Sequence, residues 1–172
     1  MAVYIEQLQV TDAEALYKFE LENRSFFEEM VPTRGDDYYN PEIFNKRHEA
    51  LLEEQVQGGS YFYLIKDNDS SILGRINLVD IDESHKIGYL GYRVGQANTG
   101  KGIAYIALKI LIETVIDEDI KQIIAKTTTN NIASQRVLEK NGFERIDTSS
   151  EEFEMNGQKM SFVNYALIIS SC

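Results

Sequence analysis

Residues Tyr89–Ala104, YLGYRVGQANTGKGIA, decide the fold of this chain. The pattern predicts a strand over 89–94, a polar loop over 95–99, and an apolar helix opened by Gly100-Lys101-Gly102. A glycine-rich loop at a helix start exposes backbone N–H groups beside the positive end of the helix dipole, which attracts phosphate or pyrophosphate. The two glycines would let such a ligand approach the backbone without a Cβ in the way. The stretch therefore predicts a site for a phosphorylated cofactor.

Two kinds of cofactor site compete for this loop. Gly95, Gly100 and Lys101 have the spacing of a P-loop, but Gly102 stands where a P-loop carries the Ser or Thr that holds Mg²⁺. The next predicted strand ends in Lys126-Thr127 and so offers no acidic metal ligand. Backbone amides can hold a pyrophosphate of the coenzyme A type without a metal. We favour this interpretation over a P-loop and over a glycine-rich turn that binds nothing.

A second motif follows the glycine loop after one predicted helix and one predicted strand. Residues 131–143 read NIASQRVLEKNGF. This segment resembles the signature N-x-x-S-x-x-V-x-E-K-x-G-F of the GCN5-related N-acetyltransferase (GNAT) superfamily, and residues 100–104 resemble that family's pyrophosphate loop. The two motifs stand in the order that the family topology requires. Ala97 departs from the family pattern, which often has Arg or Gln at this position.

Further residues are similar to one branch of the superfamily, the ribosomal-protein-alanine N-acetyltransferases. They are the segment 89–92, the Gln96-x-x-x-Gly100 spacing and the segment 22–24 (Glu-Asn-Arg). The resemblance spans roughly residues 3–168. It implies one N-acetyltransferase domain over residues 1–172 with an α/β (α+β) fold, in which a mixed, mostly antiparallel central sheet is flanked by helices.

The hydrophobic periodicity agrees with such an alternating layout. It predicts strands over 3–10, 61–66, 72–80, 85–94, 122–128, 144–155 and 159–169. It predicts helices from a cap at Thr11 or Asp12 towards Leu21, and over 41–57, 100–116 and 131–141. Asn156-Gly157 is the expected hairpin turn between the last two strands.

Composition bounds the partners and the compartment. Cys172 is the one cysteine, residues 1–10 lack a secretory leader pattern, and no stretch approaches the length of a membrane span, so we expect a cytoplasmic protein without a membrane partner. The formal charge is −11, from 28 acidic and 17 basic residues, and no basic cluster is present, which argues against a nucleic-acid partner. The acidity either steers a cationic amine or basic peptide to the protein or only keeps it soluble.

The family resemblance implies transfer of an acetyl group from acetyl-CoA to a primary amine, by direct attack and without a metal. The backbone at the end of the strand 89–94 would pair with the pantetheine arm, provided that this strand splays from the next one. Loop amides would hold the pyrophosphate. The implied cofactor-binding residues are Arg93, Val94, Asn98, Thr99, Gly100, Lys101, Gly102, Ile103, Ala104 and Asn131.

Ser134 and Asn131 are the candidate catalytic residues. Leu138 stands where some relatives carry a tyrosine acid. Ser134 lies one helical turn after Asn131 on the same face, so its hydroxyl is the candidate to meet the CoA sulfur. Asn131 would hold the pantetheine or orient the site. The alternative is that the two residues only cap the helix.

The general base stays unassigned. Carboxylates and one histidine on segments that could border the acceptor site are Glu22, Glu28, Glu29, Asp82, Glu83 and His85, and loss of the proton to water is equally open. Five aromatic residues could line the acceptor site or belong to the core, namely Phe26, Phe27, Tyr38, Tyr39 and Tyr63.

We expect an enzyme that acetylates a protein N-terminal amine of the ribosomal type. The sequence leaves two alternatives open, which are acetylation of a small amine such as a polyamine or aminoglycoside, and a non-catalytic sensor that binds acyl-CoA. It also leaves open whether the protein is a monomer or a homodimer.

Overall fold

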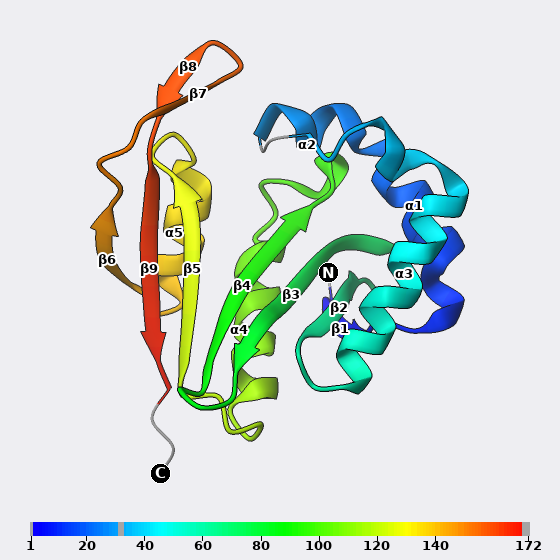
Figure 1. Ribbon diagram of the computed structural model, residues 1–172, viewed down its shortest axis with the longest axis horizontal. Coiled ribbons are helices and arrows are strands. Elements are labelled where there is room, and N and C mark those ends of the chain that lie inside the picture. The colour runs from blue at the N-terminus through cyan, green and yellow to red at the C-terminus, as the bar shows by residue number, and fades with distance from the viewer. Residues whose placement is uncertain (1, 31–32, 170–172) are drawn as a thin grey trace.

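A seven-stranded sheet runs through the whole molecule (Figure 1). The computed structural model describes residues 2–30 and 33–169. The strand order is β1-β2-β3-β4-β5-β9-β6, and every neighbouring pair is antiparallel except β4 and β5, which are parallel. The strands are β1 (Tyr4–Gln7), β2 (Tyr61–Lys66), β3 (Ile72–Asp82), β4 (Ile87–Val94), β5 (Gln122–Thr128), β6 (Glu144–Thr148) and β9 (Phe162–Ile168). The predicted mixed, mostly antiparallel sheet is confirmed.

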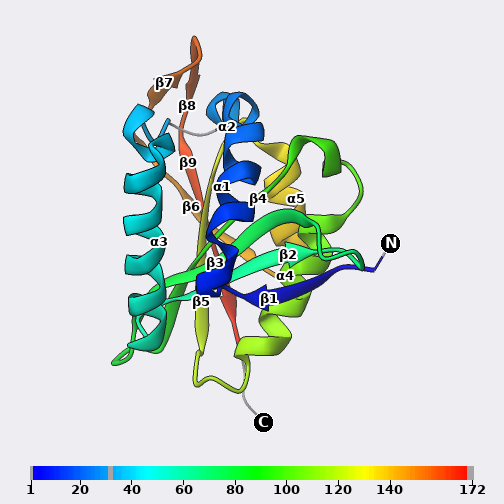
Figure 2. The same cartoon turned by 90° about the vertical axis from the view of Figure 1, so that its right-hand side faces the viewer.

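Helices cover both faces of the sheet (Figure 2). One face carries α1 (Ala13–Glu22), α2 (Arg24–Met30) and α3 (Pro41–Val56), and the other carries α4 (Ile103–Val115) and α5 (Ile132–Lys140). The period-two alternation of the strands fills two cores: in β2, Phe62 and Leu64 pack in the cluster under α1 and α3, whereas Ile65 packs in the cluster that contains α4. Alternation along a strand therefore decides which face a side chain serves.

The parallel strands β4 and β5 separate halfway along their length. They pair from Ile87–Gln122 to Leu90–Ala125 and no further. Beyond that point residues 91–94 of β4 pair with β3 alone, and residues 126–128 of β5 pair with β9 alone. Figure 1 shows the two strands meeting at one end of the sheet and diverging towards the other. The splaying that the resemblance implied is confirmed.

Most predicted elements match within a few residues. The strands 61–66 and 122–128 have the predicted bounds, and the helices 41–57, 100–116 and 131–141 are present as α3, α4 and α5. Asn40 caps α3 by accepting hydrogen bonds from the backbone N of Glu42 and Ile43. Gly142, with φ +88°, ends α5 in the left-handed conformation that favours glycine.

Five features differ from the expectations. The first strand is shorter than 3–10, because a short 3-10 turn (Val10–Asp12) follows it. Asp12 does not cap α1 through its side chain, since its carboxylate accepts from the backbone N of Gln9 instead. Helix α2 was not predicted at all.

The fourth difference is in the strand expected over 144–155. It is two strands in two sheets, because β6 pairs with β9 whereas β7 (Phe153–Met155) pairs with β8 (Gln158–Met160) across the Asn156-Gly157 turn. The last strand, expected over 159–169, is likewise divided into β8 and β9. The β7–β8 hairpin stands beyond the end of the main sheet (Figure 1).

No helix within residues 2–30 and 33–169 is long and apolar enough to cross a membrane.

Replacement of Gly74 with Ala should destabilise the protein by about 1–3 kcal/mol, the usual cost of overpacking. A Cβ at Gly74 would lie 2.4 Å from the carbonyl oxygen of Arg93 and 3.0 Å from the Cα of Val94, so the backbone of β4 must move. Gly91→Ala is the matched control in the neighbouring strand, because a Cβ there meets no atom within 4 Å. Urea unfolding of both variants measures the difference, and equal free energies of unfolding would contradict the tight β3–β4 contact.

Candidate functional site

A cavity of about 560 Å³ opens where β4 and β5 separate. Its walls come from residues 90–94 of β4 and 125–128 of β5, from the loop before α4, and from α2 and α5. The β7–β8 hairpin and the start of β9 contribute Phe153, Met155 and Phe162. Because one side of β4 lacks a partner strand beyond Leu90, its backbone along the cavity is free to pair with an extended ligand.

The glycine loop forms one end of this cavity. Gly100 and Gly102 have φ values of +76° and +75°, and a Cβ built at either position meets no atom within 4 Å. Among the residues that the structure describes, the backbone N–H groups of residues 100–104 have no hydrogen-bond partner. Open space and free donors at the start of α4 fit a pyrophosphate group.

Nearly all the residues implied for cofactor binding line the cavity. They are Arg93, Val94, Asn98, Thr99, Gly100, Gly102, Ile103, Ala104 and Asn131. Lys101 does not line it, and its side chain is exposed to solvent. The hydroxyl of Thr99 donates to the carbonyl of Gln96 at 3.0 Å and so braces the loop.

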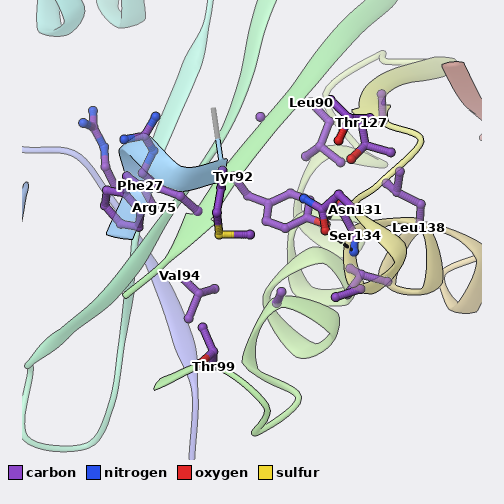
Figure 3. A pocket seen from close by; sticks show the side chains of 18 of the residues that line it. Phe27, Arg75, Leu90, Tyr92, Val94, Thr99, Thr127, Asn131, Ser134 and Leu138 are labelled. Atoms are coloured by element: carbon purple, nitrogen blue, oxygen red, sulfur yellow. Dashed lines mark hydrogen bonds between the residues drawn. The ribbon is translucent and has the colours of Figure 1, made fainter. Parts of the chain in front are cut away.

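Ser134 and Asn131 meet at the start of α5, beside Tyr92 (Figure 3). The Oδ1 of Asn131 accepts from the backbone N of Ser134 at 3.1 Å, so Asn131 does cap the helix, as the alternative from the sequence foresaw. The hydroxyl of Ser134 is not used by this cap and lies 2.8 Å from the hydroxyl of Tyr92. Burial raises the pKa of Tyr92, against a smaller opposite effect of Ser134. Tyr92 therefore stays protonated at neutral pH, and either hydroxyl of the pair can be the donor in this hydrogen bond.

The opposite face of β4 holds a charged network that the sequence reasoning missed. Glu20 of α1 is fully buried, and its carboxylate accepts from Arg75 at 2.8 Å and from Arg93 at 3.4 Å. The guanidinium of Arg93 also lies over the ring of Phe27 at 4.6 Å. A signal was present, since Glu20 shares the buried face of α1 with Leu16 and Phe19, and a charged residue on an apolar face needs a partner.

The charge of the cavity wall is opposite to that of the whole protein. Among the residues that the structure describes, four basic ones line it, namely Arg34, Arg75, Arg93 and Lys126, and no Asp or Glu does. The net charge of −11 had favoured a cationic partner as one interpretation. The residues that line the cavity carry positive charge, so the overall acidity of the protein does not support steering of a cation into this cavity.

None of the six candidate bases lines the cavity. The Asp82 carboxylate accepts from Ser84 and His85, and these hydrogen bonds lower the pKa of Asp82. Asp82, Glu83 and His85 lie in or beside the β3–β4 turn, at the end of β4 away from the cavity.

The three remaining candidates lie on or next to α2. Glu28 accepts from Thr33 and Arg24, which lower the pKa of its carboxyl in that order. Glu22 and Glu29 are exposed to solvent. The lowered pKa makes Glu28 and Asp82 weaker bases, and none of the six candidates lines the cavity, so the geometry favours none of them.

The predicted aromatic residues divide into three groups. Phe26 and Phe27 of α2 line the cavity. Tyr38 and Tyr39 are buried behind it in the core under α1 and α3, where the Tyr38 hydroxyl contacts Arg34 and Arg75. Tyr63 packs against the core on the other face of the sheet.

Helix α2 and the β7–β8 hairpin form the side of the cavity away from α4 and α5. The side chain of Asn156 in the hairpin turn donates to the carbonyl of Glu29 in α2 at 2.9 Å. No residue pattern indicates this contact, because the two segments lie far apart along the chain. Phe26 and Met30 of α2 and Met155 of the hairpin add apolar side chains to the cavity wall.

Within residues 2–30 and 33–169, no three His, Cys, Asp or Glu side chains lie close enough together to hold a metal ion.

Comparisons with known proteins point to one acetyltransferase family. The model of the acetyltransferase (GNAT) domain matches residues 3–144. The chain is 32% identical over 158 residues to the "Probable N-acetyltransferase YjcK" of Bacillus subtilis, covering 90% of this chain and 87% of that protein. It is 30% identical over 159 residues to the [ribosomal protein uS5]-alanine N-acetyltransferase of Escherichia coli, covering 91% of this chain and 82% of that protein.

A solved structure shares the fold over almost the whole chain. It is RimL, a ribosomal L7/L12 α-N-protein acetyltransferase, in complex with coenzyme A, and it superposes with a TM-score of 0.87. The sequence identity is 22%, and the match covers 98% of this chain and 95% of that one.

Proposed function

This chain belongs to the GNAT acetyltransferase family, and from that membership we propose that it transfers the acetyl group of acetyl-CoA to the amine of a protein N-terminus. The protein N-terminus as acceptor is supported by the similarity to the uS5-alanine enzyme. The observation that carries the proposal is the cavity between β4 and β5, which has a pyrophosphate-type loop at one end and the Ser134–Tyr92 pair on its wall.

The residues present fit acetyl-CoA in three places. The free N–H groups of residues 100–104 would hold the pyrophosphate. The unpaired backbone edge of residues 91–94 would pair with the amide groups of the pantetheine arm. The hydroxyl of Ser134 lies on the face of β4 opposite Glu20 and would contact the thioester sulfur. Acetyl-CoA supplies the activated acetyl group, and the protein supplies its position.

The chemistry asks for two proton movements. The amine nitrogen attacks the carbonyl carbon, the C–S bond breaks, one proton leaves the nitrogen and one reaches the sulfur. In this proposal Ser134 donates a proton to the departing thiolate, Tyr92 returns one to Ser134 through their hydrogen bond of 2.8 Å, and Tyr92 regains its proton from water. Because no candidate base lines the cavity, we propose that the amine loses its proton to water.

Location in the cytoplasm, absence of a nucleic-acid or membrane partner, and a single domain over residues 1–172 stay predictions from the sequence. The choice between monomer and homodimer stays open.

Incubation with acetyl-CoA and a panel of amines should release free thiol fastest with N-terminal peptides of ribosomal proteins. The panel includes a polyamine, an aminoglycoside and a peptide whose N-terminus is already acetylated, as the control. Faster release with a small amine would overturn the peptide proposal. Binding of acetyl-CoA without thiol release from any amine would identify a sensor instead.

Gly102→Ala should weaken acetyl-CoA binding about tenfold or more, because its Cβ enters the open space against the loop amides and the residue is strained at φ +75°. Gly58→Ala is the matched control at the end of α3, with φ +79° and equally open surroundings but no place in the cavity lining. Calorimetric titrations run in EDTA also test the metal-free site. Affinity that disappears on chelation, or equal affinities of both variants, would refute the assignment of the loop.

Ser134→Ala should slow the chemical step about ten- to a hundredfold, at the low end of general-acid effects because CoA is a good leaving group. Acetyl-CoA affinity and stability should change little, since the cap of Asn131 uses the backbone N of Ser134, which Ala keeps. Single-turnover rates are compared with Tyr92→Phe and with the double variant. The two losses should not add if the hydroxyls act together. A wild-type rate in Ser134→Ala would remove Ser134 from the mechanism.

A further inference from the structure

The cavity wall that faces α1 and α2 carries more positive charge than its one carboxylate balances. Arg75 and Arg93 are neighbours in the β3–β4 register, and both bind the buried Glu20. Arg34 lies on the same side, where it donates to the hydroxyl of Tyr38 at 2.6 Å and stacks over that ring at 4.7 Å. Among the described residues Arg34 has no carboxylate partner. This side of the cavity therefore has three guanidinium groups, and Glu20 binds two of them.

The three arginines are crowded as well as in excess. The side chains of Arg75 and Arg93 are 7% and 18% exposed, so water screens them poorly. Burial lowers the pKa of Arg93, and the charge of Arg34 lowers it further. Like charges held together beside a cavity are stabilised by an anion that enters it.

Next to the arginines the wall has an unused polar atom and an open space. Asn77 and Gly91 are paired in the β3–β4 register. Each lies two residues along its strand from Arg75 or Arg93, and therefore on the same face of the sheet. The Oδ1 of Asn77 is buried without a hydrogen-bond partner among the described residues. A Cβ at Gly91 would meet no atom within 4 Å. Both residues line the cavity, so this part of the wall has space for a ligand group that donates a hydrogen bond to Asn77.

The arginines are separated from the loop assigned to the pyrophosphate. Arg93 projects towards α1 and α2, where it contacts Glu20 and Phe27. Tyr92 and Val94 project to the other face, into the core that contains α4. Figure 3 shows the same division, with Phe27 and Arg75 on one side of β4 and Asn131 and Ser134 on the other. These arginines therefore lie on the face of β4 opposite Ser134, away from the face that α4 covers.

We propose that the acceptor is an amine that carries an oxyanion, with Arg34 and Arg93 binding the oxyanion and Asn77 accepting a hydrogen bond from the amine. This deepens the proposed function and rests on it. Two residues along a strand span about 7 Å, which is also the reach of two residues of an extended peptide. For a protein N-terminus, the oxyanion is then on the side chain of the second residue, either as the carboxylate of an acidic residue or as the phosphate of a phosphorylated one.

The test compares three short peptides that differ only at their second residue, which is Glu, Gln or phosphoserine. Calorimetry measures their binding to the enzyme loaded with CoA, which cannot react, and thiol release measures kcat/KM with acetyl-CoA. We expect at least one anionic peptide to bind about tenfold more tightly than the Gln peptide and to have a higher kcat/KM through a lower KM. The preference between Glu and phosphoserine identifies the source of the oxyanion. Equal affinity for all three peptides would overturn the proposal.

Variants locate the effect on the wall. Arg34→Gln should reduce the ratio of affinities for the anionic and the Gln peptide to about twofold. Arg34→Lys should keep part of this preference because the charge remains. Arg47→Gln is the matched control, since Arg47 also stacks on Tyr38, at 5.4 Å, but does not line the cavity. An unchanged ratio in Arg34→Gln, or an equal change in Arg47→Gln, would contradict the assignment.

The two readouts separate this inference from the proposed function. Absence of thiol release from every peptide would refute peptide acetylation, while the binding ratio would still decide whether the wall selects an oxyanion.

Discussion

The separation of β4 from β5 is the constraint on which the rest of the site depends. Two parallel strands that stay paired would bury their backbone groups and leave no room between them. Here pairing stops after Leu90 and Ala125, so the backbone of residues 91–94 keeps one unpaired edge along a cavity of about 560 Å³. The start of α4 lies at the end of that edge with its own unpaired N–H groups. A single break in the sheet thus provides both the space and the donors.

Because β4 is at the break, its two faces serve different purposes. Tyr92 points to α5 and pairs with Ser134, whereas Arg93, the next residue, points to α1 and pairs with Glu20. Alternation along one strand therefore places proton-donating hydroxyls on one side and fixed charge on the other, within neighbouring residues. The hydroxyl side belongs to the cofactor and the charged side to the acceptor, in the function proposed here.

Burial of Glu20 has a cost that its partners must offset. An unpaired carboxylate in an apolar core is strongly unfavourable, and two arginines with good geometry make it tolerable. The same carboxylate holds Arg75 and Arg93 in fixed positions at the cavity wall. The charge cluster is thus a way to keep guanidinium groups ordered and poorly hydrated, which strengthens their interaction with an anion.

The sequence alone determined most of the local elements and the residues of the proposed cofactor side of the site. Gly100, Gly102, Asn131 and Ser134 lie in contiguous motifs whose chemistry depends on backbone conformation and spacing within one loop or one helix turn, and all four line the cavity. The acceptor side was decided only by the tertiary structure. Glu20, Arg75 and Asn77 come from a helix and a strand with no motif of their own, and α2 meets the β7–β8 hairpin across more than a hundred residues of chain, through Asn156 and Glu29. Contacts between distant segments depend on how the sheet twists and packs, and residue patterns along the chain carry no record of that geometry.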